Sequence, residues 1–260
     1  MRVFNKVIRF FILLSLLMTF SLSEGMTNLS DTIDKAREQE ILVQKILKNY
    51  IMVGMHNKYN NPEENLKNNI LEFEKNMEAL DEFATSKKAF KNIEKVISTW
   101  EPIKLKLVEP KTIDLAKKLQ TMLLELSKIA RETTKLYTRQ TGVLLGETMD
   151  ASASLGVDSQ KMAMLYLMKA WGADSAEIKE QMSTAIGSFE TSMTMLKKSN
   201  MNTDEMLKTL KTTQRNFLYF KIMDELDSSS IPTLIYKKSN IILEDTKKLG
   251  IQYSKSIILN

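Results

Sequence analysis

Apolar residues recur at intervals of three and four along most of this 260-residue chain, the spacing of one face of an α-helix. One such stripe runs from Ile70 to Leu80, and a second runs from Ile186 to Leu196. Alternating β-branched runs, which are typical of strands, are rare, and glycine and proline are scarce. The sequence therefore predicts an all-α protein.

The same pattern of residues occurs twice. Residues 32–80 align without a gap with residues 148–196, at a shift of 148 − 32 = 116, and 12 of the 49 aligned positions are identical. The residues repeated at this shift are Thr32, Asp34, Gln44, Lys45, Tyr50, Met52, Glu64, Ile70, Phe73, Glu74, Met77 and Leu80. Self-similarity at a fixed period indicates two copies of one supersecondary unit. The later part of the copies aligns better at a shift nearer 120.

Each copy contains four predicted helices joined by short loops. Asn61 and Pro62 mark one helix start, and Asp174 or Ser175 marks its counterpart in the second copy. Short loops make consecutive helices antiparallel neighbours. We therefore expect two tandem antiparallel four-helix bundles, residues 28–142 and 143–257. No strong stop signal precedes Gly142, so a long continuous helix through the junction stays open.

Residues 1–23 have the pattern of a secretory signal peptide. Three basic residues precede an apolar run from Phe10 to Leu22, and small residues surround the expected cleavage point near Ser23. The run is shorter than the ~20 apolar residues that span a bilayer. No cysteine follows it, so a lipid anchor is not expected. We expect cleavage of this leader and a periplasmic mature chain.

Composition narrows the function classes. Without the leader the formal charge falls from +5 to +2, that is 34 Lys and Arg against 32 Asp and Glu, and mixed charges do not predict nucleic-acid binding. The chain has no cysteine and therefore no disulfide, thiolate nucleophile or thiol metal site. Its one histidine, His56, lies in a polar loop, and no phosphate loop or nucleophile elbow is present. Neither an enzyme nor a cofactor or metal site is expected.

Two glutamines stand out because they fall on apolar helix faces at equivalent places in the two copies. A buried amide with unmet hydrogen bonds costs on the order of 1–3 kcal/mol, so Gln44 and Gln160 each need a partner, either a neighbouring helix backbone or a ligand. Lys45 and Lys161 follow them and are either solvated or ligand contacts. Tyr166 is either a core residue with its hydroxyl in water or a ligand contact.

The residues 151–156 are small on every face of the predicted helix. Such a run either permits close approach of another helix or leaves room for a small ligand.

The segment from Ser159 to Leu167, SQKMAMLYL, resembles the signature of the PilJ-type family, the N-terminal sensor domain of type IV pili methyl-accepting chemotaxis transducers. It is also similar to the nitrate/nitrite-sensing domain of bacterial two-component kinases. VQKILKNYI, from Val43 to Ile51, matches more weakly. The resemblance implies a periplasmic helical bundle whose first helix supplies a site, often for a small anion such as nitrate. The ligand-binding residues implied are Ser159, Gln160, Lys161, Tyr166, Gln44 and Lys45.

The chain departs from the family pattern at one position. The family places an arginine four residues before the conserved glutamine, where this chain has Glu40 in the first copy and Gly156 in the second. Glu40 would repel an anion, and Gly156 leaves space. Lys45 and Lys161 match the family's second basic position and are the remaining cationic candidates.

Two functional hypotheses follow. The first is an exported tandem sensor-type bundle that binds a small anion or metabolite, the ectodomain of a membrane chemoreceptor or sensor kinase, or both, because no output domain follows in the sequence. The second is a structural or protein-interaction bundle of the cell envelope without a small-molecule ligand. The identity of the ligand, a site in the first copy and a homodimer stay open.

Overall fold

The computed structural model describes residues 32–84, 86–138, 143–225 and 231–258. All regular secondary structure in these ranges is α-helical, which confirms the all-α prediction. The first helix covers residues 32–54. The helices that follow are α2 (Pro62–Glu82), α3 (Lys87–Leu107), α4 (Ile113–Thr138), α5 (Val143–Ala170), α6 (Ala176–Lys197), α7 (Asp204–Glu225) and α8 (Pro232–Ile258). The predicted leader and the junction at 139–142 lie outside the described residues.

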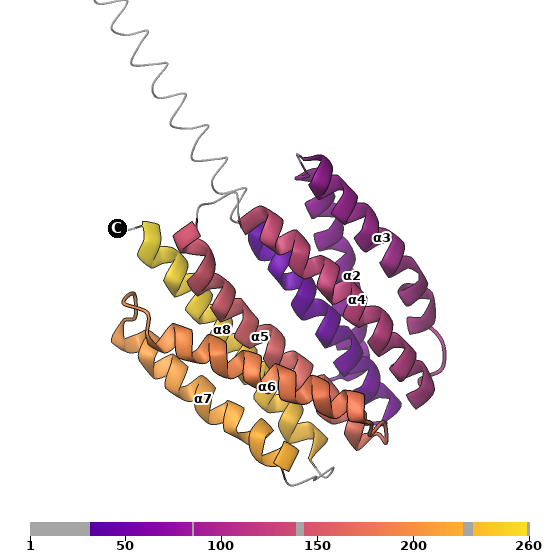
Figure 1. Ribbon diagram of the computed structural model, residues 1–260. Coiled ribbons are helices and arrows are strands. Elements are labelled where there is room, and N and C mark those ends of the chain that lie inside the picture. The colour runs from indigo at the N-terminus through magenta and orange to yellow at the C-terminus, as the bar shows by residue number, and fades with distance from the viewer. Residues whose placement is uncertain (1–31, 85, 139–142, 226–230, 259–260) are drawn as a thin grey trace, which may run out of the picture.

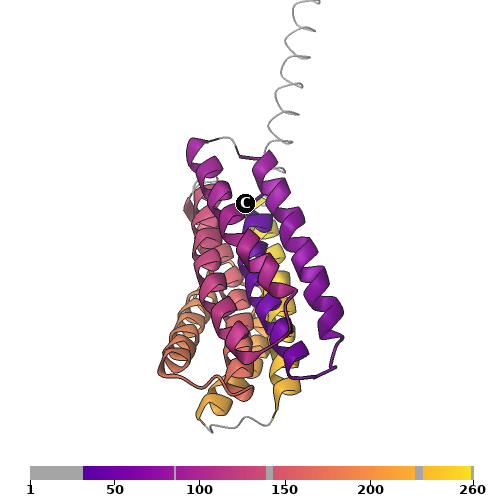
Figure 2. The ribbon, with the colours of Figure 1, turned by 90° about the vertical axis from the view of Figure 1, so that its right-hand side faces the viewer.

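The helices lie side by side in two groups (Figures 1 and 2). In one group α3 packs against α2 and α4. The first helix donates hydrogen bonds to both α2 and α4, through the amides of Gln39 and Gln44. In the other group α5 packs against α6 and α8, and α7 packs against α6 and α8. This grouping is compatible with the predicted pair of four-helix bundles.

The first helix and α5, which begin the two repeats, run parallel to each other. Arg37 pairs with Asp150, and Lys48 bonds to Gln160, so residue numbers rise together along both helices. Together with α8, these two helices form what we call the repeat interface. One hydrophobic core continues across it from both groups of helices.

Burial along the two parallel helices follows the repeat. Every side chain in residues 39–52 is buried except that of Lys45, and every side chain in the equivalent residues 155–168 is buried except that of Lys161. A helix that is apolar on nearly all faces belongs inside a protein, in contact with several neighbours. The repeated stretch is therefore the centre of the structure.

Two local expectations have clear outcomes. Ser175 caps α6 as predicted, because its hydroxyl accepts the Ile178 N–H at 3.2 Å. Asn61 occupies the N-cap position of α2, but its backbone is left-handed with φ 49°, and its side chain makes no capping bond, so the expected side-chain cap is wrong there. Pro62 alone fits the first turn.

The small residues of α5 permit close contact with α8. A Cβ built on Gly156 would lie 3.0 Å from the Thr246 hydroxyl and 3.1 Å from Leu243. The Ser152 hydroxyl donates to the Thr246 carbonyl at 2.9 Å. Close helix approach, one of the two roles considered for residues 151–156, is therefore present.

A substitution at Gly54 tests the contact between the end of the first helix and Trp171, which follows α5. A Cβ at Gly54 would overlap the ring of Trp171. We expect Gly54→Ala to lower the free energy of unfolding by about 1–3 kcal/mol in urea denaturation, because the ring must move out of a packed position. Gly187→Ala is the matched control. It lies in α6 with open space around it and should raise stability by about 0.5–1 kcal/mol. Equal effects of the two substitutions would contradict this contact.

Candidate functional site

Lys48 lies inside the repeat interface and is 1% exposed. Its Nζ donates to Gln160 Oε1 at 2.5 Å on α5, and to Asn240 Oδ1 at 2.7 Å and Ser239 Oγ at 3.1 Å on α8. The nitrogen also lies 4.1 Å from the ring centre of Tyr236. An ammonium group has three donors, and the second repeat supplies an acceptor for each of them. The first helix is thus joined to both α5 and α8 through one side chain.

The charge of Lys48 has no opposite charge beside it. Among the described residues no carboxylate forms an ion pair with its Nζ. Burial, with a smaller contribution from the positive charge of Lys45, lowers the pKa of Lys48 well below the usual lysine value. An unpaired charge in a protein interior is costly even when it is hydrogen-bonded. A negative charge nearby would relieve this cost.

A cavity of about 210 Å³ lies between the first helix, α2 and α8, next to the acceptors of Lys48. Its walls are mostly amides, and the lining residues are Lys45, Asn49, Asn60, Asn65, Asn69, Tyr236, Asn240, Leu243 and Glu244. We call it the asparagine cavity. Asn69 is 4% exposed, and its Nδ2 is a buried donor with no acceptor among the described residues. Glu244, the one carboxylate in the lining, is exposed.

The hydroxyl of Tyr236 fixes the walls of the asparagine cavity. It donates to Asn49 Oδ1 at 2.8 Å on the first helix and accepts from Asn65 Nδ2 at 3.5 Å on α2. Burial raises the pKa of Tyr236 above its ordinary value, so the hydroxyl keeps its proton. Three helices are therefore held at set positions around the cavity before any ligand enters.

A second, much smaller cavity lies at the equivalent place in the other repeat. It has a volume of only about 10 Å³, room for one water at most. Lys161 and Gln181 line it at a shift of 116 from Lys45 and Asn65, and Gln120, Leu123 and Leu124 line it at a shift of 120 from Asn240, Leu243 and Glu244. Each cavity therefore combines the first two helices of one repeat with the fourth helix of the other.

The two cavities differ in the polarity of equivalent residues. Adding 116 takes Lys48 to Met164, Asn49 to Leu165 and Asn69 to Ala185. In the smaller cavity Gln120 Nε2 of the first repeat donates to Gln181 Oε1 of the second at 3.1 Å. Packing alone is thus satisfied by apolar residues at these positions. The fold therefore does not require a lysine or asparagines at these positions of the first repeat.

Lys161 has neighbours of opposite charge, unlike Lys48. Burial lowers its pKa, while Asp158 on the same helix acts in the opposite direction. Glu40 accepts from Arg131 at 2.6 Å and 3.0 Å, and the charge of Arg131 reaches Asp158 as well. The repulsion of an anion expected from Glu40 is therefore offset by an arginine from α4.

The site residues predicted from the sequence have different surroundings in the structure. The amide of Gln160 donates to the Ser239 carbonyl at 2.8 Å, which is the backbone partner considered as one alternative. Gln44 donates at 3.4 Å to the hydroxyl of Ser127. The further partner of Gln160, Lys48, was not foreseen.

Among the remaining candidates, Lys45 lines the asparagine cavity, and Lys161 shares the small cavity with Gln44. Ser159 is buried and donates to the Gly156 carbonyl at 2.7 Å. Tyr166 is buried, with its hydroxyl at the backbone of Ile231, and lines neither cavity.

Sequence reasoning missed Lys48 and the asparagines around it. A signal for Lys48 was present in the sequence. It lies four residues after Gln44 on the same helix face, and it aligns with the apolar Met164 in the second copy. The asparagines gave a weaker signal. They lie in a polar segment, and only the fold brings them to Tyr236 and Asn240.

Comparison of the chain with protein-family models, curated proteins and solved structures gave no match. In the described ranges no group of His, Cys, Asp or Glu is arranged to hold a metal ion. Across those same ranges, no helix combines the length and the apolar character that crossing a membrane requires.

Asp158 makes stability depend on pH. It is 4% exposed, and burial raises its pKa from 3.8 to about 6. The folded protein therefore holds this proton more tightly than the unfolded chain, and the stabilising contribution is lost as the pH rises from about 4 through about 6. We expect Asp158→Asn to raise the free energy of unfolding at pH 7.5 by about 1–3 kcal/mol and to flatten this part of the pH profile. Urea denaturation from pH 4 to 8 measures both. An unchanged slope in the variant would contradict the assignment.

Proposed function

We propose that this protein binds a small anion in the asparagine cavity, as an exported sensor-type helical bundle. The observation that carries the proposal is the buried ammonium of Lys48, which has hydrogen-bond acceptors but no opposite charge and lies beside a polar cavity. Lys45, one helical turn earlier, lines the wall itself, with the carboxylates of Glu72 and Glu38 near enough to act on its charge. The binding site thus favours an anion on electrostatic grounds.

The hydrogen-bonding groups of the cavity support an oxygen-bearing anion. The Nδ2 of Asn69 is buried and needs an acceptor, and the ammonium of Lys45 is a charged donor. Oxyanions and small carboxylates carry several acceptor oxygens and would satisfy both groups. The volume of about 210 Å³ suits an inorganic oxyanion with water or a short organic acid.

The sensor role rests on the arrangement of the cavity between repeats. An anion bound there would contact the first helix, α2 and α8, and would stabilise the charged form of Lys48, which is bonded to α5. Binding would therefore change the interaction between the two halves of the molecule. The signal-peptide pattern of residues 1–23 supports export, and a membrane chemoreceptor or sensor kinase would receive the signal.

Thermal unfolding in a panel of sodium salts tests the binding proposal. We expect nitrate, nitrite, formate or acetate to raise the melting temperature above that in chloride at equal ionic strength, because a ligand of the folded state stabilises it. Lys48→Met and Asn69→Ala introduce the residues found at the equivalent positions of the second repeat, and each should abolish the shift. Lys45→Met should weaken binding about tenfold or more.

Lys161→Met is the matched control, because Lys161 is the repeat equivalent of Lys45 but lines the closed cavity. It should keep the full anion response. No response across the panel, or an equal loss in Lys161→Met and Lys45→Met, would contradict the proposal and favour a bundle that acts only through protein contacts. Circular dichroism of each variant separates loss of binding from loss of fold.

A further inference from the structure

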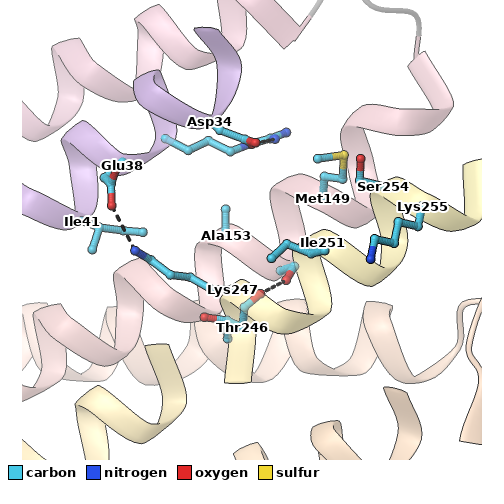
Figure 3. Close-up of a pocket in the computed structure, with 13 residues that line it drawn as sticks. Asp34, Glu38, Ile41, Met149, Ala153, Thr246, Lys247, Ile251, Ser254 and Lys255 are labelled. Carbon is cyan, nitrogen blue, oxygen red and sulfur yellow. Dashed lines mark hydrogen bonds and ion pairs between the residues drawn. The ribbon is translucent and has the colours of Figure 1, made fainter. Parts of the chain in front are cut away.

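A larger cavity lies elsewhere on the repeat interface, between the first helix, α5 and α8 (Figure 3). Its volume is about 400 Å³, within the range of about 300–1,000 Å³ typical of small-molecule sites. None of its lining residues lines the asparagine cavity. We call it the amphiphilic groove, because apolar side chains form its middle and charged side chains lie around it.

The middle of the amphiphilic groove is apolar. Figure 3 shows Ala153 of α5 and Ile251 of α8 between two ends, with Ile41 of the first helix at one end and Met149 at the other. Ile251 is 57% exposed although it belongs to this lining, so the groove leaves a large apolar side chain in contact with water. A ligand with an apolar portion would remove this surface from water, which favours binding.

Both acidic side chains that line the groove are already paired. Glu38 accepts from Lys247 at 3.0 Å, and Asp34 lies 3.5 Å from Arg37. The same arginine holds Asp150 at 2.7 Å through its other terminal nitrogen. Each carboxylate of the lining therefore already has a cationic partner, so the groove has no unpaired negative charge that would attract a cation.

Two donors of the groove remain without acceptors among the described residues. Lys255 is exposed and has neither a hydrogen bond nor an ion pair there, and Figure 3 places it beside Ser254 at the end of the groove opposite Ile41. The Nε of Arg37, a residue only 9% exposed, is buried without an acceptor. Positively charged donors around an apolar middle match a molecule with an anionic head and an apolar tail.

We propose that the amphiphilic groove binds a single-chain carboxylate amphiphile, of the class of medium-chain fatty acids. The carboxylate lies at Lys255 and Ser254, and the chain extends over Ala153 and Ile251 toward Ile41. The pair of Glu38 and Lys247 closes the far end, which limits the length of the tail. This site is independent of the anion site in the asparagine cavity.

Isothermal titration of the full chain with decanoate tests the proposal, with decanol and decyltrimethylammonium as probes of the same tail. Decanoate should bind with one-to-one stoichiometry, decanol about tenfold more weakly or worse, and the cationic probe more weakly still, because only a carboxylate pairs with the ammonium of Lys255. Lys255→Glu should weaken decanoate binding by about tenfold or more. Ala153→Phe should abolish it by filling the middle of the groove.

Two controls separate this site from others. Lys208→Glu makes the same charge change on the exposed surface of α7 and should leave decanoate binding unchanged. Lys161→Met should also leave it unchanged, since Lys161 lines the small cavity and no part of the groove. The proposal is overturned if decanoate does not bind, if decanol binds equally well, or if Lys255→Glu and Lys208→Glu weaken binding to the same extent. If Ala153→Phe does not fold, the comparison of Lys255→Glu with Lys208→Glu tests the proposal by itself.

Discussion

The structure depends on a buried ammonium group at the contact between its two repeats. Lys48 extends from the first helix and reaches acceptors on α5 and α8, so separation of the repeats would break three hydrogen bonds at once. Its charge is not neutralised by any ion pair in the described part of the chain, and burial opposes it. Stability alone would favour an apolar residue there, as Met164 shows at the equivalent place. Packing of the interface therefore does not by itself require a lysine at this position.

Duplication placed two equivalent cavities on the molecule, and they have diverged. The cavity next to Lys161 is closed by the contact of Gln120 with Gln181, and its lysine has Asp158 nearby. The asparagine cavity has a larger volume and polar walls, and the Lys48 side chain beside it has no ion-pair partner among the described residues. The repeat with the weaker sequence resemblance to a sensor family thus holds the larger cavity. Comparison of equivalent positions in the two repeats shows which polar residues the fold does not require.

Prediction from the sequence was most successful for features that depend on residues close together in the chain. The stripes with spacings of three and four predicted the helices, and Ser175 marked the start of α6. The repeated glutamines were correctly expected to need partners, and one of the two alternatives for Gln160, a neighbouring backbone, is present. Lys48 could have been found from its position on the same helix face as Gln44. Tyr236 could not, because it lies 187 residues from Asn49, the residue that accepts its hydrogen bond.

By itself, the sequence determined the helical class, the internal repeat and the apolar faces of the repeated stretch, because these follow from spacing along one chain. Only the tertiary structure decided which copy has an open cavity. That outcome depends on helices distant in sequence, since α8 of the second repeat completes the cavity of the first, and α4 of the first repeat completes that of the second. The physical reason is that cavity volume and charge compensation are properties of side chains from several helices together, whereas periodicity is a property of each helix alone.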